Sequence, residues 1–393
     1  MVPSYEREHV DPVVAAAFDG SMVRRGKLYI SELDLRSGDV GNWGFWGSEF
    51  WRSTHNAATF RRKALYFAAN ALTHGAGYHA YDMDGGWYAT AEAQDTWQAV
   101  NRMAAHARPM PFAPERIAIV GGERYWDFQS FGRSRVVSYL LREQPREALA
   151  RTGVQWNQHL VDELLESQEA DLPKVVVFND LTCITHAQYA ELRRRYAKDG
   201  RVIVWCYRPG LFAADGARIE EELGLRNAPK ALRRLGFADG SCTDPLMAGV
   251  KGTLMPSYPY YGFEFPDAIS SPDPAAGWKT LAPFKGTDIP ALAVRRHGTF
   301  TEVYTSMPGG ITPRLCRNLV HAAGLKPLVD TDELSGYGSG IFYILAQSTG
   351  VKRFRLPDGV SPDKVLAGPA FRKDGAGYAV RLNRADIFIL SVK

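Results

Sequence analysis

The segment KLYISELDLRS, residues 27–37, carries acidic side chains with a spacing that suits chemistry at the end of a strand. Glu32, Asp34 and Arg36 alternate with apolar residues. Because side chains alternate between the two faces of a strand, these three polar side chains are expected to share one face. The two carboxylates therefore lie together at the carboxyl end of the predicted strand, which makes them the first candidates for a reactive site.

A second acidic pair follows the next predicted strand. In GAGYHAYDMDGGW, residues 75–87, Asp82 and Asp84 are again two residues apart, and two glycines end the strand. The aspartates could hydrogen-bond sugar hydroxyls or cap the turn before the glycines. If Asp82 points inward, His79 points toward the helices as a core histidine. Strands that end in inward-facing carboxylates are typical of the mouth of a parallel β/α barrel, so we expect Glu32 and Asp82 to face one pocket.

A helix and an aromatic loop separate these two strands. The helix is predicted to have Ser53 or Thr54 as its N-cap and to end at Gly75. The preceding loop, DVGNWGFWGSEFW, contains Trp43, Trp46 and a third tryptophan between glycines. An indole offers a large amphipathic surface on which the C–H face of a sugar can pack. The loop therefore suits a carbohydrate pocket, although the same indoles could simply cover the barrel core.

Composition excludes several classes of function. The formal charge of the 393 residues is +4, which is too small and too evenly spread to predict binding to nucleic acid. No apolar run reaches the length of a membrane span and no signal peptide is evident, so a cytoplasmic protein is expected. The four cysteines are far apart and form no CxxC pair, which argues against a zinc site or a disulfide framework. Neither a metal nor a cofactor is predicted.

A proline-rich stretch, residues 108–116, marks the first expected domain boundary. A complete β/α barrel needs roughly 250 residues. Residues 1–112 are therefore expected to hold only the last two or three strands of a barrel.

The pattern of predicted strands and helices differs between the middle and the end of the chain. Residues 113–325 alternate unbroken apolar strands with helices, which predicts a parallel, doubly wound α/β sheet. Strands are expected at 117–122, 174–180, 201–210, 290–298 and 300–306, and helices at 133–153, 185–200, 216–224 and 312–324. Residues 326–393 contain short strands between turns and predict a small antiparallel β-sandwich.

The succession of segments resembles the C-terminal half of β-galactosidase-like glycoside hydrolases of family 42. The resemblance covers nearly the whole chain and is carried by YISELDLRS, FRRKALYFAANALTHGAGYHAYDMDGGWY, LPKVVVFNDLTCITHAQYAELRRRYAKDGRVIVWCYRPG and LCRNLVHAAGLKPLVD. It implies the end of a catalytic β/α barrel, then a glutamine-amidotransferase-like domain that mediates trimer formation in relatives, then a small β domain.

The resemblance also implies roles for particular residues. Glu32 falls on the strand that supplies the nucleophile of such retaining enzymes, and Asp34 is its rival because it shares the face. Arg36 would keep one of the two ionised, or it could equally form a structural ion pair. The residues expected to contact a carbohydrate substrate are Arg36, Trp43, Trp46, Asp82, Asp84 and Trp87. Retaining hydrolysis needs a second carboxyl group about 5 Å from the first, and upstream of Glu32 the sequence offers no Asn-Glu pair at a strand end.

The apparent absence of the acid/base residue leaves three interpretations. The chain could be part of a glycosidase that needs a separate or deleted N-terminal half of the barrel. It could be a noncatalytic carbohydrate-binding or oligomerisation module. It could be an amidotransferase-like hydrolase that uses a cysteine, but Cys206 in WCYRPG lacks the small flanking residues of a nucleophile elbow, and Cys183 has no matching His-x-Glu.

Overall fold

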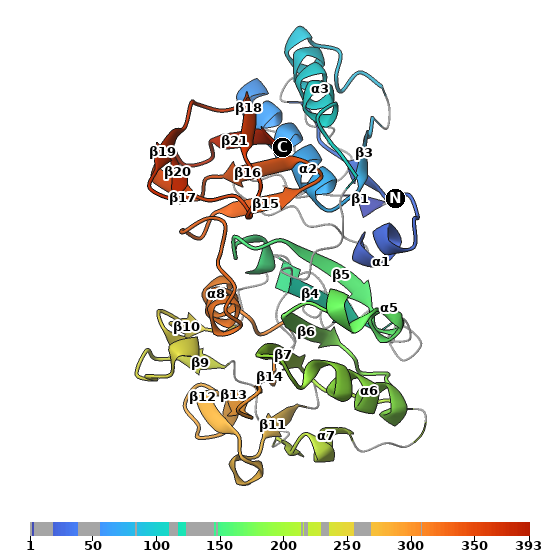
Figure 1. Ribbon diagram of the computed structural model, residues 1–393, viewed down its shortest axis with the longest axis vertical. Coiled ribbons are helices and arrows are strands. Elements are labelled where there is room, and N and C mark those ends of the chain that lie inside the picture. The colour runs from blue at the N-terminus through green and yellow to red at the C-terminus, as the bar shows by residue number, and fades with distance from the viewer. Residues whose placement is uncertain are drawn as a thin grey trace, which may run out of the picture. The chain divides into compact units, whose positions relative to one another are not determined.

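The chain forms two compact units in a computed structural model (Figure 1). The structure describes residues 2–3, 19–37, 56–82, 85–109, 117–122, 145–146, 148–213, 215, 219–228, 236–254, 269–307 and 309–393. Unit 1 comprises residues 1–112, 150–155 and 327–393, and unit 2 comprises residues 113–149 and 156–326. The predicted barrel segment and the predicted C-terminal β domain thus belong to the same unit.

Unit 1 begins with a three-stranded parallel sheet in the order β1-β2-β3. Its strands are β1 (Val2–Pro3), β2 (Ile30–Leu33) and β3 (Gly77–Ala80). Its helices are α1 (Asp19–Arg24), α2 (Ala57–Thr73) and α3 (Ala91–Ala104). Both strands predicted to carry the acidic pairs are confirmed, and they are neighbours.

Helix α2 is buried along most of its length. Its N-cap is Asn56, whose side chain accepts a hydrogen bond from the backbone N–H of Thr59, so the predicted caps at Ser53 and Thr54 are wrong. One side of α2 packs on β2 and β3, and another packs on the C-terminal strands β15 and β16 (Figure 1). There the Asn70 amide donates to the Tyr343 hydroxyl over 3.0 Å. A helix that is covered on both sides can be apolar all round.

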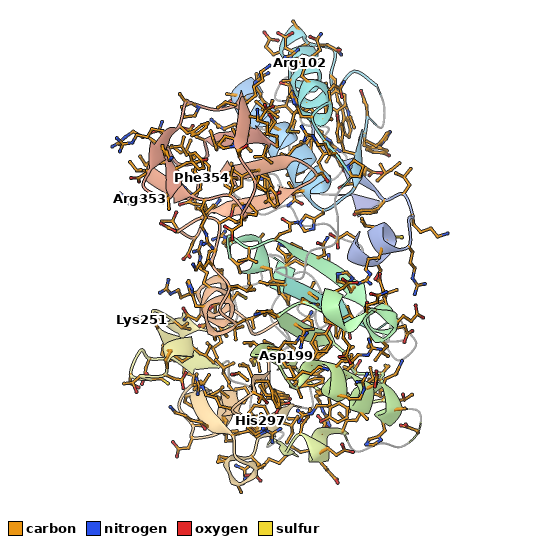
Figure 2. The ribbon with its side chains drawn as sticks, viewed as in Figure 1. Arg102, Asp199, Lys251, His297, Arg353 and Phe354 are labelled. Atoms are coloured by element: carbon orange, nitrogen blue, oxygen red, sulfur yellow. The ribbon has the colours of Figure 1, made fainter. Side chains whose placement is uncertain are left out.

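The C-terminal part of unit 1 consists of two antiparallel sheets around one core. The first contains β15 (Leu334–Gly338), β16 (Ile341–Leu345), β21 (Ile387–Val392) and β18 (Pro362–Ala367), and the second contains β17 (Gly350–Phe354), β20 (Gly377–Leu382) and β19 (Arg372–Asp374). Phe354 contacts the ring of Phe342 in the first sheet and the ring of Tyr378 in the second (Figure 2). The aromatic core therefore joins the two sheets.

Unit 2 contains a seven-stranded sheet in the order β12-β13-β14-β7-β6-β4-β5. Its strands are β4 (Ile117–Gly121), β5 (Trp156–Leu160), β6 (Val175–Asp180), β7 (Arg201–Cys206), β12 (Lys279–Pro283), β13 (Pro290–Arg296) and β14 (Phe300–Thr305). Five of these strands are parallel, but β13 is antiparallel to both β12 and β14. The expectation of an entirely parallel sheet is wrong, because only three residues join β13 to β14 and such a short loop makes a hairpin.

Helices lie on both faces of the unit 2 sheet. Helix α6 (His186–Tyr196) packs on Trp205, whereas Cys316 of α8 (Pro313–Ala322) lies near Cys206, which alternates to the other face. The remaining elements are α5 (Val161–Glu166), α7 (Ile219–Glu222), the 3-10 helices η3 (Glu169–Asp171), η4 (Pro245–Met247) and η5 (Pro274–Ala276), and the strand pairs β8 (Leu225–Asn227) with β11 (Ser270–Pro272) and β9 (Phe237–Ala238) with β10 (Gly252–Thr253). Most of the helix predicted at 133–153 lies outside the described residues.

Among the described helices, none combines the length and the apolar character that crossing a membrane requires.

Candidate active site

The register between β2 and β3 brings Glu32 beside His79. The two residues are direct partners in the parallel pair, and in-register residues of neighbouring strands place their side chains on the same face. On the opposite face Tyr29 packs against Ala71 of α2, and Leu33 is fully buried. Glu32 and His79 therefore lie on the face that is turned away from α2.

Both side chains on this face are accessible. Glu32 is partly buried and His79 is exposed. Within the ranges that the structure describes, neither side chain takes part in a hydrogen bond or an ion pair. The expectation that His79 points toward the helices as a core histidine is wrong, because its position in the register follows Glu32. A carboxylate and an imidazole thus stand side by side with their polar groups available.

The face continues beyond the ends of the two strands. The backbone N–H of Tyr81 donates to the carbonyl of Leu33 over 3.2 Å. This bond extends the parallel ladder by one step and places Tyr81 beside Asp34, on the face of Glu32. The ring of Tyr81 meets Trp87 edge to face at 6.0 Å between centroids. An aromatic residue that the sequence analysis did not select therefore borders the acidic positions.

Asp34 and Arg36 are held more tightly than Glu32. Asp34 is 2% exposed, Arg36 is 8% exposed, and each has interaction partners. The Arg36 guanidinium lies 4.7 Å from the centroid of the Trp87 ring, a cation–π contact. Of the two rival carboxylates, Glu32 is the one that a ligand can reach.

Asp82 closes the turn that follows β3. Its Oδ2 atom accepts a hydrogen bond from the backbone N–H of Trp87 over 3.1 Å, which is the turn-capping role that the sequence left open. Tyr88 then ties the two post-strand segments together, because its hydroxyl lies 2.9 Å from the carbonyl oxygen of Leu35 and 2.7 Å from that of Tyr81. The register groups Glu32 with His79 rather than with Asp82.

Three predicted site residues, Trp43, Trp46 and Asp84, lie outside the described residues. In the part of the chain that is described, no cluster of His, Cys, Asp and Glu side chains could hold a metal ion.

The two buried thiols of unit 2, Cys206 and Cys316, are poorly placed for nucleophilic chemistry. Burial raises the pKa of the Cys206 thiol, and the nearby Cys316 raises it further. Burial also raises the pKa of Cys316 to about 12. After β7 the left-handed backbone position, where a nucleophile elbow would carry its reactive residue, holds Tyr207 at φ 62°. A thiolate, the form of cysteine that reacts, is therefore disfavoured at the end of β7.

Comparison with known proteins connects this arrangement to glycoside hydrolases of solved structure. No family model and no curated protein matches the sequence. The fold is similar to that of a β-galactosidase from Bacillus circulans sp. alkalophilus, with a TM-score of 0.58 and 13% identity over 93% of this chain and 60% of that protein. It is also similar to a β-galactosidase from Rahnella sp. R3, with a TM-score of 0.62 and 12% identity over 96% of this chain and 57% of that protein.

A third solved structure has a different activity. The α-L-fucosidase isoenzyme 2 from Paenibacillus thiaminolyticus aligns with 95% of this chain and 62% of its own length, at 12% identity and a TM-score of 0.53. At these identities the likeness shows a shared fold. The chain spans less than two thirds of the length of each of these three enzymes. It has the fold of the C-terminal half of family 42 β-galactosidases.

Proposed function

We propose that this chain is the C-terminal portion of a retaining glycoside hydrolase of the β-galactosidase type, with Glu32 as its nucleophile. The observation that carries the proposal is the position of Glu32 on the face of β2 turned away from α2, where it is partly exposed and has no partner among the described residues. In a β/α barrel the helices lie outside, so that face is the barrel interior. The similar fold of known β-galactosidases supports the same assignment.

The proposal gives each part of the chain a role. Residues 1–112 form the last strands of a catalytic barrel, residues 113–325 an amidotransferase-like domain for assembly, and residues 326–393 a small β-sandwich. By resemblance the assembled protein is a trimer. Unit 2 is taken as structural because the Cys206 thiol is buried and its pKa is raised.

The mechanism requires a second carboxyl group. The Glu32 carboxylate attacks the anomeric carbon, while an acid about 5 Å away protonates the leaving oxygen and later activates water. Asp34 does not suit the nucleophile because it is buried and partnered. We propose that the acid/base residue lies on a barrel strand outside these 393 residues. The Arg36 guanidinium, which contacts the Trp87 ring, then supplies a positive charge two residues along the chain from the Asp34 carboxylate.

The test is covalent trapping on the chain with its barrel completed by the missing strands. A 2-deoxy-2-fluoro-β-galactoside with a good leaving group should accumulate as an ester on the peptide that contains Glu32. Glu32→Gln should abolish both labelling and hydrolysis, whereas Asp34→Asn should leave the label in place. Labelling at another residue would refute the assignment. Hydrolysis by this chain alone, lost in Glu32→Gln, would refute the external acid.

A noncatalytic carbohydrate-binding module is the second candidate, and the observation that favours it is that Glu32 is the one accessible carboxylate found on the described part of this sheet face. In that case Glu32→Gln would keep most of its affinity for a galactoside, and no turnover would appear in the completed barrel.

The interpretation as a cysteine-dependent hydrolase is tested separately by alkylating the thiols of the native protein. Alkylation should leave Cys206 unmodified and should not change any amidase activity.

A further inference from the structure

His79 stands beside Glu32 on the neighbouring strand, and the proposed reaction does not yet use it. It is the direct register partner of Glu32 on β3, it is exposed, and its side chain has no hydrogen bond or ion pair to any residue that the structure describes. Resting on the proposed function, we infer that His79 binds the substrate hydroxyl next to the anomeric carbon, the 2-hydroxyl of the sugar.

The spacing of the strands supports this role. Neighbouring strands lie about 4.8 Å apart, and a nucleophile must approach the reacting carbon to about 3–3.5 Å. When Glu32 meets the anomeric carbon, the imidazole of His79 therefore stands one strand to the side, within reach of a substituent on the adjacent ring carbon.

The chemistry of the two groups also matches. A neutral imidazole presents one donor and one acceptor nitrogen, and a sugar hydroxyl can both donate and accept. The Glu32 carboxylate can only accept when it is ionised. A hydroxyl between them could donate to Glu32 and accept from His79 at the same time. No side chain in the described part of the site competes for either partner.

Tyr81 adds an apolar surface to the same face. It lies two residues beyond His79, and its ring is fixed against Trp87 at 6.0 Å. Aromatic rings pack on apolar faces and leave polar edges to hydrogen-bonding neighbours. The face of a sugar ring against Tyr81 and its hydroxyl edge toward His79 would orient the anomeric carbon toward Glu32. His79 is thus a specificity residue as well as a contact.

The experiment compares a β-galactoside with its 2-deoxy analogue in the completed barrel. His79→Ala should lower kcat/KM for the galactoside by about fivefold to tenfold, because a neutral hydrogen bond is lost. The same variant should change kcat/KM for the 2-deoxy analogue less than threefold, an estimate within ordinary context effects. His79→Gln, which keeps a donor and an acceptor, should restore part of the loss. The matched control is Arg102→Ala, an exposed residue on α3 (Figure 2), which should change neither substrate.

The outcomes separate this inference from the proposed function. If Glu32→Gln abolishes hydrolysis while His79→Ala affects both substrates equally or neither, the inference is wrong and the proposed function stands. If the wild type hydrolyses neither substrate, or Glu32→Gln retains activity, the proposed function fails and the inference fails with it. Equal melting temperatures of His79→Ala and the wild type show that a loss of rate is not a loss of folding.

Discussion

Two glutamates on strands of the two units have opposite surroundings. Glu302 on β14 is completely buried. Its carboxylate accepts hydrogen bonds from Trp205 at 3.2 Å and from Arg295 at 2.8 Å and 3.1 Å, and it pairs with Arg193. It also lies 2.8 Å from a ring nitrogen of His297, which is labelled in Figure 2. Glu32 on β2 is partly exposed and has no such partner among the described residues.

The difference shows how a fold separates structural charges from available ones. Removing a carboxylate from water costs several kcal/mol unless charged partners compensate it. The guanidinium groups of Arg193 and Arg295 provide this compensation for Glu302. Glu32 remains hydrated and needs no compensation. The proposed reaction therefore uses Glu32, a carboxylate without a partner among the described residues. The charge cluster around Glu302 instead belongs to the core of unit 2. Substitutions around four carboxylates, Glu302, Glu333, Asp244 and Glu32, test this division.

The largest effect is expected at Glu302. Glu302→Gln should lower the free energy of unfolding of unit 2 by about 3 kcal/mol, because it leaves the partly buried guanidinium groups of Arg193 and Arg295 without their counter-charge. Hydrogen exchange of the β7 and β14 amides measures the change in unit 2. A variant as stable as the wild type would mean that Glu302 is maintained for a reason other than folding, and the comparison with Glu32 would lose its basis.

A buried pair in the C-terminal sheets should behave in the same way but with a smaller loss. Lys352 Nζ lies 2.5 Å from Glu333 Oε1 and 2.7 Å from Ser348 Oγ, and both members of the ion pair are nearly inaccessible. Lys352→Met should destabilise unit 1 by about 3 kcal/mol, since Glu333 stays buried without its cation. The double variant Lys352→Met with Glu333→Leu should recover most of the loss. Thermal unfolding followed by circular dichroism tests both, and no recovery would contradict the pairing.

Asp244 is intermediate, because its partners are partly exposed. Burial alone would raise the pKa of Asp244, but hydrogen bonds from Arg296 and from the backbone N–H of Leu246 outweigh it and hold the pKa below its usual range. A lowered carboxyl pKa stabilises the fold above the unfolded value of about 3.9 and ceases to do so as pH falls through the folded value. Asp244→Asn should cost about 1 kcal/mol at pH 6 and less at pH 2.5, because the stabilisation declines as the pH falls below the unfolded value. Urea unfolding at both pH values measures this, and a pH-independent cost would count against it.

The smallest effect on stability is expected at Glu32. Glu32→Gln should change the free energy of unfolding by less than about 0.5 kcal/mol, because the side chain is partly exposed and has no partner among the described residues. The same substitution is expected to abolish turnover in the completed barrel. Differential scanning calorimetry beside the activity assay makes the comparison. A large loss of stability would indicate a structural carboxylate like Glu302.

Local signals in the sequence predicted the elements well. The apolar runs at 175–180 and 201–206 are strands, because several β-branched residues in succession suit a sheet buried on both faces. Thr312 and Pro313 correctly placed the start of α8. Strand β5 was missed because its buried residues are largely polar, and WNQHL shows neither alternation nor an apolar run.

These local sequence signals could not predict which of the candidate site residues lie together. The sequence analysis assigned faces within each strand by alternation, but the register between β2 and β3 depends on how the strands pair. That register decides that Glu32 stands beside His79. Alternation placed His79 opposite Asp82, which was taken as the inward-facing residue, although Asp82 lies beyond the end of β3 and caps a turn. An exposed histidine in a strand gave no signal of its own.

The burial of α2 on both sides also limits where the chain can be truncated. One side of this helix supports the strand that carries Glu32, and the other receives Tyr343 from the last segment of the chain. A protein truncated at residue 326 would expose apolar side chains of α2 on the side that faces away from β2. Strands β2 and β3 and the distant carboxyl terminus must therefore be expressed and engineered together.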